Sequence, residues 1–172
     1  MTPKNKKLEK KVQNIFKKYG LSKSHSLISA KALINAELVG APSHGLSRLK
    51  MYCDRIKNKL INPKPKIKVK SISKSISYVD ADNSIGFVAA DIGIKKAIIN
   101  AQKTGIGFVA IKNSGHYGLS GYYIEQAVKK NLIGYVFYKC TSSNSSYGSK
   151  KVYLELIQYV LVHQHPQKFL LY

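Results

Sequence analysis

The sequence predicts an α/β protein in which N-terminal helices precede a mixed sheet. In the first part of the chain, apolar residues recur at helical spacing. After the prolines at positions 63 and 65, short alternating or apolar runs alternate with helical patterns, which is typical of α/β proteins. The 172 residues are 44% hydrophobic, which is enough to bury a core.

Three helices are predicted in residues 1–62. The first covers Lys4–Tyr19 and stops at Gly20. Ser22 is the expected N-cap of a second helix that runs toward Gly40, and a third covers Leu46–Lys59. Apolar residues recur at helical spacing in the first helix, namely Leu8, Val12, Ile15 and Phe16. The residues expected on or near the buried side of the second helix are Leu27, Ile28, Ala32, Leu33, Ala36 and Leu38.

Residues 63–137 are predicted to form part of an α/β domain. The segment "NPKPKIKVKSISKSISYVDAD" is a linker that leads into one or two strands. A helical run at 86–103, a buried strand "GIGFVAIKN", a helical run at 119–130 and the strand-like "LIGYVFY" follow. The change of composition near Pro63 predicts a domain boundary between residues 62 and 63.

The formal charge of +21 at pH 7 is typical of proteins that bind nucleic acid or anionic surfaces. The positive residues are almost all lysines, with Arg48 and Arg55 the only arginines, and they spread from Lys4 to Lys168. Base and phosphate recognition favours the arginine fork. A solvated lysine-rich surface is therefore the favoured interpretation and no nucleic acid is expected, with a small basic nucleic-acid-binding module as the alternative.

The remaining composition indicates a cytoplasmic protein with no membrane partner. Cys53 and Cys140 form no disulfide framework, and no apolar run approaches the ~20 residues needed to cross a bilayer. The charged N-terminus has no apolar segment behind it, so no signal peptide is expected.

The segment "APSHGLSRLKMY" places Ser43, His44 and Arg48 at a predicted helix start. His44 and Arg48 are four residues apart, so they share one face if the helix has begun by His44, and could then hold a small carboxylate between them. In the alternative interpretation Ser43 only caps the helix, while His44 and Arg48 are solvated.

The segment "IKNSGHYGLSGYY" joins a predicted strand to a predicted helix. Glycines at positions 115, 118 and 121 allow a tight turn, and His116 and Ser120 lie where backbone N–H groups point outward. α/β proteins present catalytic or ligand-binding side chains at such places. No G-x-G-x-x-G opens the helix, so this is not the dinucleotide fingerprint. In the alternative interpretation His116 is structural or solvated.

The segments "SHGLSRLKMY" and "YVDADNSIGFVAADIGIKKAIINAQKTGIGFVAIKNSGHYGLSGYYIEQAVKKNLIGYVF" resemble the malate/L-lactate dehydrogenase family, which also contains ureidoglycolate and sulfolactate dehydrogenases. The resemblance covers residues 4 to 137. It implies part of a non-Rossmann mixed α/β cofactor-binding domain, NAD or NADP as cofactor, interconversion of small 2-hydroxy and 2-oxo acids, and a homodimer.

The resemblance also implies roles for individual residues. Ser43, His44 and Arg48 match the family's substrate-pocket segment, and His116 matches its loop histidine. Oxidation of a 2-hydroxy acid needs a base for the hydroxyl proton and a cation for the carboxylate. His116 is therefore assigned as acid/base and Arg48 as carboxylate clamp, with His44 the rival acid/base. Ser120 and Gly121 are the expected cofactor contacts, and no metal site is predicted.

The resemblance breaks after Phe137. Back-translation of Phe137–Tyr147, with one nucleotide removed and one restored, reads "FTNAPQAIAPY", and one nucleotide added before the codon of Glu155 gives "GTNPICFGAPTSTK". Both are segments expected in the family, and "YGSKKVYL" between them is already in its frame. We therefore expect residues 138–172 to be the frameshifted tail of a truncated, inactive dehydrogenase, in which His163 and His165 form no metal site. A non-functional fragment is a further alternative.

Overall fold

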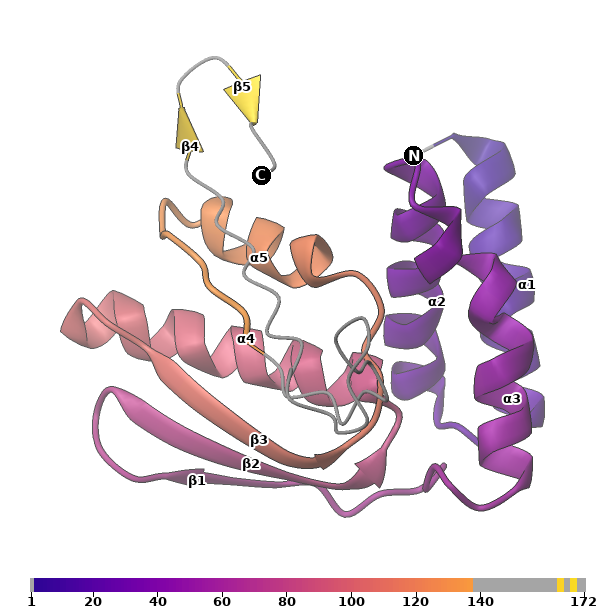
Figure 1. Cartoon of the computed structure of the whole chain (residues 1–172), viewed down its shortest axis with the longest axis horizontal. Helices are drawn as coiled ribbons and strands as arrows, with labels where there is room; N and C mark the ends of the chain where they lie inside the picture. The colour runs from indigo at the N-terminus through magenta and orange to yellow at the C-terminus, as the bar shows by residue number, and fades with distance from the viewer. Residues whose placement is uncertain (1, 138–163, 166–167, 170–172) are drawn as a thin grey trace, which may run out of the picture.

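The computed structural model describes residues 2–137, 164–165 and 168–169 (Figure 1). Within them the helices are α1 (Pro3–Lys18), α2 (Lys23–Leu38), α3 (Leu49–Lys57), α4 (Gly86–Thr104) and α5 (Ser120–Val128), with short 3-10 helices η1 (Pro42–His44) and η2 (Leu46–Arg48). The strands are β1 (Lys68–Ser71), β2 (Ile76–Ser84), β3 (Phe108–Ser114), β4 (Gln164–His165) and β5 (Lys168–Phe169). Helices followed by a mixed sheet confirm the predicted α/β class.

Side-chain caps start both N-terminal helices. The hydroxyl of Thr2 accepts a hydrogen bond from the N–H of Asn5 at 3.4 Å, and Pro3 occupies the first turn, where its missing N–H costs no hydrogen bond. The hydroxyl of Ser22 accepts from the N–H of His25 at 3.2 Å, which confirms the predicted N-cap. The starts of these helices are therefore determined by local sequence.

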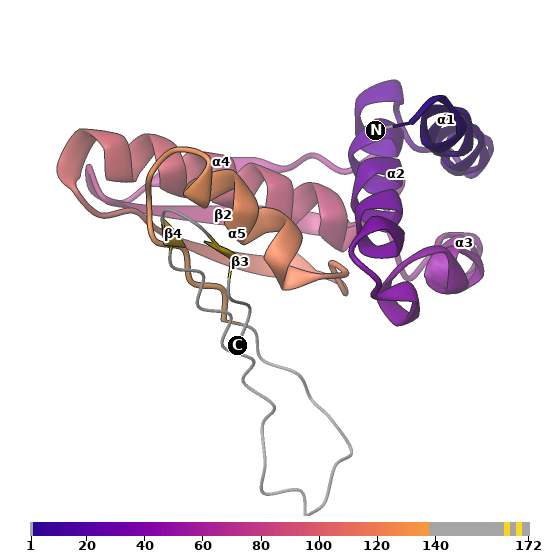
Figure 2. The same cartoon turned by 90° about the horizontal axis from the view of Figure 1, so that it is seen from above.

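The helix α2 is the centre of the N-terminal part. Figure 2 shows it between α1 and α4, and it contacts both. A helix covered on two sides buries most of its circumference, and the buried residues here are Ser26, Ser29, Ala30, Ala32, Leu33, Ile34 and Ala36. The two serine hydroxyls donate to backbone carbonyls one turn earlier. Leu38, expected near the buried side, is 53% exposed because it lies in the last turn beside the exposed Val39 and Gly40.

The third helix begins at Leu49, later than predicted. His44 and Arg48 end two separate 3-10 helices, and Gly45 between them has a non-helical backbone (φ −98°, ψ −136°). The carboxylate of Glu37 stabilises this break, because it accepts the first N–H of η2 at 2.6 Å. The condition under which His44 and Arg48 would share one face of an α-helix is therefore not met, because the helix begins only after both of them.

The strands β1, β2 and β3 form a mixed sheet in that order, with β1 antiparallel and β3 parallel to β2. The helix α4 connects β2 to β3 and covers one face of the sheet, with α5 beyond it (Figure 1). Along β2 the side chains alternate, so that Val79 and Ala81 are buried. The register places Asp80 beside Lys68 and Lys112.

The strand β3 is not the buried strand that the sequence predicts. Its residues are nearly all exposed, and Phe108 is 55% exposed. Among the described residues β3 pairs in the sheet with β2 only, and α4 packs on one face of the strand. The apolar side chains of β3 are therefore covered on that one side. The strand predicted for "LIGYVFY" is reduced, up to residue 137, to an isolated bridge at Gly134.

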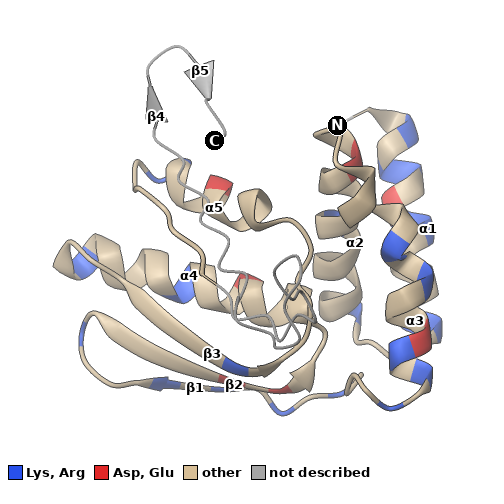
Figure 3. Ribbon diagram, in the orientation of Figure 1, with Lys and Arg blue, Asp and Glu red and all other residues tan. Residues whose placement is uncertain are grey.

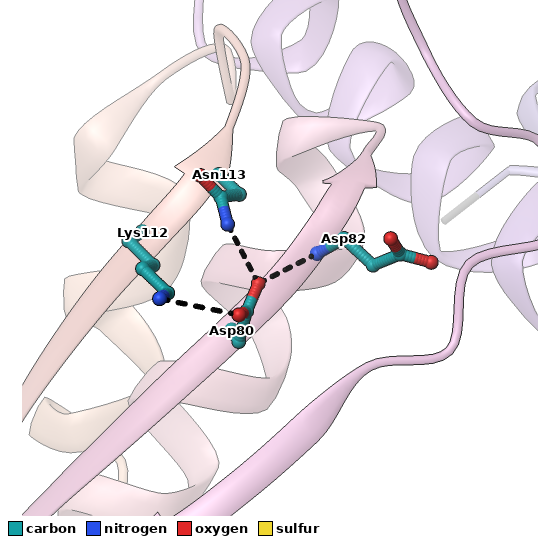
Figure 4. Close-up of polar contacts among 4 residues, drawn as sticks. All are labelled: Asp80, Asp82, Lys112 and Asn113. Atoms are coloured by element: carbon teal, nitrogen blue, oxygen red, sulfur yellow. Dashed lines mark hydrogen bonds and ion pairs between the residues drawn. The ribbon is translucent and has the colours of Figure 1, made fainter.

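A polar cluster joins the C-terminal ends of β2 and β3. Figure 4 shows the Asp80 carboxylate accepting from the side chain of Asn113 at 2.9 Å and from the N–H of Asp82 at 3.2 Å, with the Lys112 ammonium 3.4 Å away. These partners lower the pKa of Asp80, the Asn113 hydrogen bond most of all. Asp82 and Asn113 have positive φ, which Asp and Asn tolerate, and the sheet register shifts between Asp80 and Ser84. The cluster shapes the turn from β2 into α4.

The positive side chains are distributed over many elements. Figure 3 shows Lys and Arg on α1, α3, α4 and the strands rather than on one recognition element, which agrees with a solvated lysine-rich surface. No helix in the described part of the chain is long and apolar enough to cross a membrane. The same residues contain no group of three or more His, Cys, Asp or Glu that could hold a metal ion.

The predictions for the tail and for the domain boundary stay predictions. The tail at 138–172, which is expected to be frameshifted, lies outside the described residues apart from the backbone of β4 and β5, and so do Cys140 and His163. The boundary between residues 62 and 63 stays a prediction. One hydrophobic cluster contains residues from both sides of it, including Leu33 of α2 and Phe87 of α4.

Candidate active site

His116 lies in the loop between β3 and α5. This loop packs on the first turn of α4 so closely that a Cβ on Gly86 would overlap the backbone of Gly115 and His116. Gly118, at φ +82°, lies against the ring of Phe87 with no room for a side chain. The start of α4 therefore determines where the loop holds its histidine.

A buried tyrosine supports the imidazole of His116. Tyr52 of α3 is 1% exposed, and its ring packs on that of Phe87 with centroids 4.6 Å apart. Its hydroxyl oxygen is 2.6 Å from Nδ1 of His116, and the N–H of Gly118 donates to the same nitrogen at 3.3 Å. His116 as a whole is exposed, so the protein holds one edge of its ring and leaves the other accessible.

His44 and Arg48 approach from η1 and η2. The rings of His44 and His116 are stacked, with centroids 6.0 Å apart and an interplanar angle of 23°. Ser43 Oγ lies 3.1 Å from Nδ1 of His44, so Ser43 contacts the histidine and caps neither η1 nor α3. Arg48 Nε donates to the carbonyl oxygen of Ser43 at 2.8 Å. Tertiary packing thus brings together the four residues predicted for catalysis and substrate binding, although no shared helix face does so.

Partial enclosure and nearby positive charge favour the neutral form of His116. Lost hydration at its enclosed edge lowers the pKa most, and His44, Arg48 and Arg55 lower it further. Burial raises the pKa of Tyr52, although the two arginines oppose this. Near neutral pH the site therefore holds a neutral imidazole against a protonated phenol.

Ser120 and Gly121, the expected cofactor contacts, begin α5. Their N–H groups have no carbonyl one turn earlier in the helix, and the helix dipole adds partial positive charge, so this turn fits a phosphate or amide oxygen of a nicotinamide cofactor. The side chain of Ser120 is buried, with its hydroxyl 2.9 Å from that of Tyr117. The backbone, rather than the Ser120 hydroxyl, is the part suited to the cofactor.

Sequence reasoning missed three residues that shape the site: Tyr52, Gly86 and Phe87. Tyr52 ends the segment "APSHGLSRLKMY" one helical turn beyond Arg48, and that spacing could have identified it. Gly86 and Phe87 resemble an ordinary helix start in the sequence. Only the packing of α4 against the His116 loop gives them a role.

An α/β fold that places a tyrosine-supported histidine beside a second histidine and an arginine defines a class of site suited to proton transfer on a small anion. The chain belongs to the malate/L-lactate dehydrogenase family, which it matches over residues 4–154. This confirms the resemblance seen in the sequence, and the family is one of oxidoreductases.

Curated relatives and a solved structure agree with the family. The chain is 32% identical over 151 residues to the L-sulfolactate dehydrogenase of Methanocaldococcus jannaschii, covering 88% of this chain and 43% of the relative. Two further relatives have names that state their cofactor. The ureidoglycolate dehydrogenase (NAD(+)) of Escherichia coli is 30% identical, and the match covers 85% of this chain and 42% of the relative. The (2R)-3-sulfolactate dehydrogenase (NADP(+)) of Chromohalobacter salexigens is 31% identical, and the match covers 77% of this chain and 39% of the relative.

The malate dehydrogenase of Pyrococcus horikoshii has a similar structure. The TM-score is 0.89 at 32% identity, over 98% of this chain and 48% of that one. The chain therefore spans less than half the length of each of these relatives.

Proposed function

We propose that this chain carries the substrate-binding and proton-transfer part of an NAD- or NADP-dependent dehydrogenase that interconverts a small 2-hydroxy acid and its 2-oxo acid. The observation that carries the proposal is the meeting of His116, from the β3–α5 loop, with His44 and Arg48, from the segment before α3. Relatives named for malate and sulfolactate support this substrate class, because both compounds are 2-hydroxy acids.

His116 transfers the proton in this proposal. In the reducing direction C2 of the oxo acid gains a hydride with its electron pair, and the π pair of the C=O bond moves onto oxygen. That oxygen then takes a proton from Nε2 of His116. A nicotinamide ring, when bound, gives or accepts the hydride. His44, whose ring centroid lies 6.0 Å away, is the rival acid/base.

Arg48 is suited to hold the substrate carboxylate. Its Nε is bound to the carbonyl of Ser43, which orients the guanidinium. The terminal nitrogens make no hydrogen bond to the described residues, so they remain available as a fork. A pre-oriented arginine fork binds a carboxylate through two parallel charge-assisted hydrogen bonds.

Part of the cofactor would be held at the first turn of α5. The backbone N–H groups of Ser120 and Gly121 supply the donors, only a few residues after His116 in the chain. NAD and NADP are both consistent with this arrangement, since relatives carry each of them in their names.

We also propose that the working enzyme is a homodimer, as the family resemblance implies. Many large apolar side chains are exposed in the described residues, among them Ile72, Ile106 and Phe108, and a dimer interface could cover such side chains. Sedimentation equilibrium of the active enzyme tests this proposal. A monomer at all concentrations used in the activity assay would contradict it.

Substrate binding can be tested on the chain itself without turnover. Titration with pyruvate or oxaloacetate should shift the imidazole NMR signals of His44 and His116, and Arg48→Ala should weaken the binding. Lys57→Ala is the matched control, because it removes one exposed positive charge of α3 away from the site. Binding that weakens equally in both variants would indicate general charge attraction and contradict the proposed clamp.

Turnover is proposed to require the restored reading frame. A frameshift across the codons of residues 137–172 predicts negligible turnover of malate or lactate with NAD(P) by this chain, and activity once the frame and its continuation are restored. The nucleotide sequence across these codons is the direct measurement. Intact codons quite different from those inferred would contradict the frameshift, and so would robust turnover by the present chain.

A further inference from the structure

Nδ1 of His116 has two hydrogen-bond partners of different kinds. The backbone N–H of Gly118, at 3.3 Å, can only donate. The hydroxyl of Tyr52, at 2.6 Å, can donate or accept. A proton on Nδ1 would point toward the N–H of Gly118, so Nδ1 must be the acceptor. Tyr52 then donates its hydroxyl proton to the same nitrogen.

We propose that Tyr52 is a positioning residue that, together with the N–H of Gly118, holds neutral His116 in the tautomer with its proton on Nε2, so that the free site offers a hydrogen-bond donor to the C2 oxygen of a 2-oxo acid. The identity of the substrate rests on the proposed function. The tautomer rests only on the contacts of Nδ1.

The surroundings of Tyr52 favour this role. The ring is buried against Phe87, which fixes the direction in which the hydroxyl points. Burial also raises the pKa of the phenol, so the hydroxyl keeps the proton that it donates. The Tyr52 ring is therefore held in one place, and its hydroxyl stays protonated and neutral.

The two histidines differ in how their tautomers are determined. Nδ1 of His44 has the hydroxyl of the exposed Ser43 at 3.1 Å, and no backbone N–H of the described residues points at it. A hydroxyl alone accepts either tautomer. His116 therefore has a defined reacting nitrogen and His44 does not, which favours His116 as the acid/base.

The tautomer decides what the free site can do. A carbonyl oxygen accepts the Nε2–H hydrogen bond, whereas a substrate hydroxyl cannot pass its proton to a nitrogen that already carries one. Near neutral pH the site is therefore arranged for the 2-oxo acid. Delivery of the proton requires the imidazolium, in which Nδ1 gains a proton and Tyr52 turns its hydroxyl to accept it.

The groups around His116 oppose that imidazolium. His44 of η1, Arg48 of η2 and Arg55 of α3 all lower the pKa of His116. The rings of Tyr52 of α3 and Tyr117 of the same loop also lie beside it. No described carboxylate is among the groups that shift this pKa. Above this lowered pKa the neutral form of His116 predominates in the free site, and its tautomer decides which ring nitrogen carries the proton.

Nitrogen NMR on the full chain with isotope-labelled histidine reads the tautomer directly and does not depend on enzyme activity. Above the pKa of His116 the protonated and unprotonated ring nitrogens have well-separated signals, and His116→Gln identifies which signals belong to this residue. The expected result is a proton on Nε2 and an unprotonated, hydrogen-bonded Nδ1. A proton on Nδ1 in the neutral form would overturn the inference.

Tyr52→Phe tests the tyrosine itself. Without the hydroxyl, the Nδ1 signal should move toward that of a free acceptor, while the N–H of Gly118 still disfavours a proton on Nδ1. Tyr122→Phe is the control, because it removes a half-buried phenol hydroxyl of α5 that bonds to no described residue. Unchanged His116 signals in Tyr52→Phe, with the amide spectrum of a folded chain, would contradict the positioning role.

The outcomes separate the two proposals. A chain with the Nε2–H tautomer that binds neither pyruvate nor oxaloacetate contradicts the proposed function and leaves the tautomer intact. A chain that binds these acids with the proton on Nδ1 contradicts the inference and leaves the proposed function intact.

Discussion

The two central side chains of the site each have one end held by the protein and the other end left for a ligand. His116 is held at Nδ1 by Tyr52, and Arg48 is held at Nε by the carbonyl of Ser43. Such anchoring reduces the freedom that a side chain loses when substrate binds. The anchors distinguish these residues from the solvated His and Arg of the alternative interpretation.

Arg48→Lys keeps the positive charge and loses the planar fork. We expect the Kd for pyruvate or oxaloacetate to rise roughly tenfold, about 1.4 kcal/mol, because one of two charge-assisted hydrogen bonds is lost. The measurement is a binding titration. Arg55→Lys, a nearby arginine of α3 assigned no substrate contact, should change Kd much less, and equal effects would argue against the clamp.

The proposed role of His116 predicts how the proposed reaction depends on pH. Its pKa lies below the usual 6.5, so the imidazolium appears only at lower pH than for an ordinary histidine. We expect kcat/KM for 2-oxo acid reduction to rise as pH falls through this pKa, and oxidation of the hydroxy acid to fall. Steady-state kinetics of the frame-restored enzyme measure both, and a reduction rate that falls over the same range would contradict His116 as the acid.

At the scale of elements, the site forms where three irregular segments meet. These are η1 and η2 before α3, the first turn of α4, and the β3–α5 loop. Each is a helix start or a loop, where not all backbone groups are used in the regular hydrogen bonds of a helix or sheet. The close approach of the α4 start to the loop makes the position of His116 depend on Gly86.

Gly86→Ala adds a methyl group where the loop backbone already lies. We expect a loss of about 1–3 kcal/mol in the free energy of unfolding, with a shift of the His116 signals, because the loop must move away. Urea denaturation measures the first and NMR the second.

Gly115→Ala is the matched control for this variant. It lies in the same loop, and its added Cβ would meet open space, so the change should stay within about 0.5 kcal/mol. Similar losses in both variants would show that α4 does not position the loop.

At the scale of the whole molecule, α2 links the N-terminal helices to the α/β part. The hydrophobic cluster around it includes residues of α1, α3 and α4, and Tyr52 and Phe87 at the site belong to the same cluster. The support of His116 is therefore continuous with the core that joins the two parts.

Leu33→Ala tests whether the two parts fold together. Leu33 is fully buried, so we expect a loss of about 2–5 kcal/mol in unfolding free energy. Urea titration followed by amide signals of both α1 and β2 should show one shared, lowered midpoint. Two separate midpoints would support the boundary predicted at residues 62–63 as a true domain boundary.

Leu60→Ala is the control for the core variant. Leu60 is 62% exposed, so its truncation should change the unfolding free energy by no more than about 0.5 kcal/mol. An equal loss at Leu60 would mean that burial around α2 is not the source of stability.

Much of the fold and most of the site could be predicted because their signals are local. Ser22 determines its helix start through an N–H three residues on, and Val79 and Ala81 follow the two-residue alternation of a strand. His116 and Arg48 are candidate site residues because few side chains can transfer a proton or bind a carboxylate through two hydrogen bonds. The burial predicted for Leu38 and for β3 is wrong, because an apolar residue type alone does not show which neighbours will cover the side chain.

The sequence by itself determined the helices, the α/β class, the family and the residue types of the site. Only the tertiary structure decided how those residues meet, because the decisive contacts join segments far apart in the chain. Tyr52 and His116 are 64 positions apart, and no local rule pairs them. Their 2.6 Å contact exists because α3, the start of α4 and the β3–α5 loop pack together.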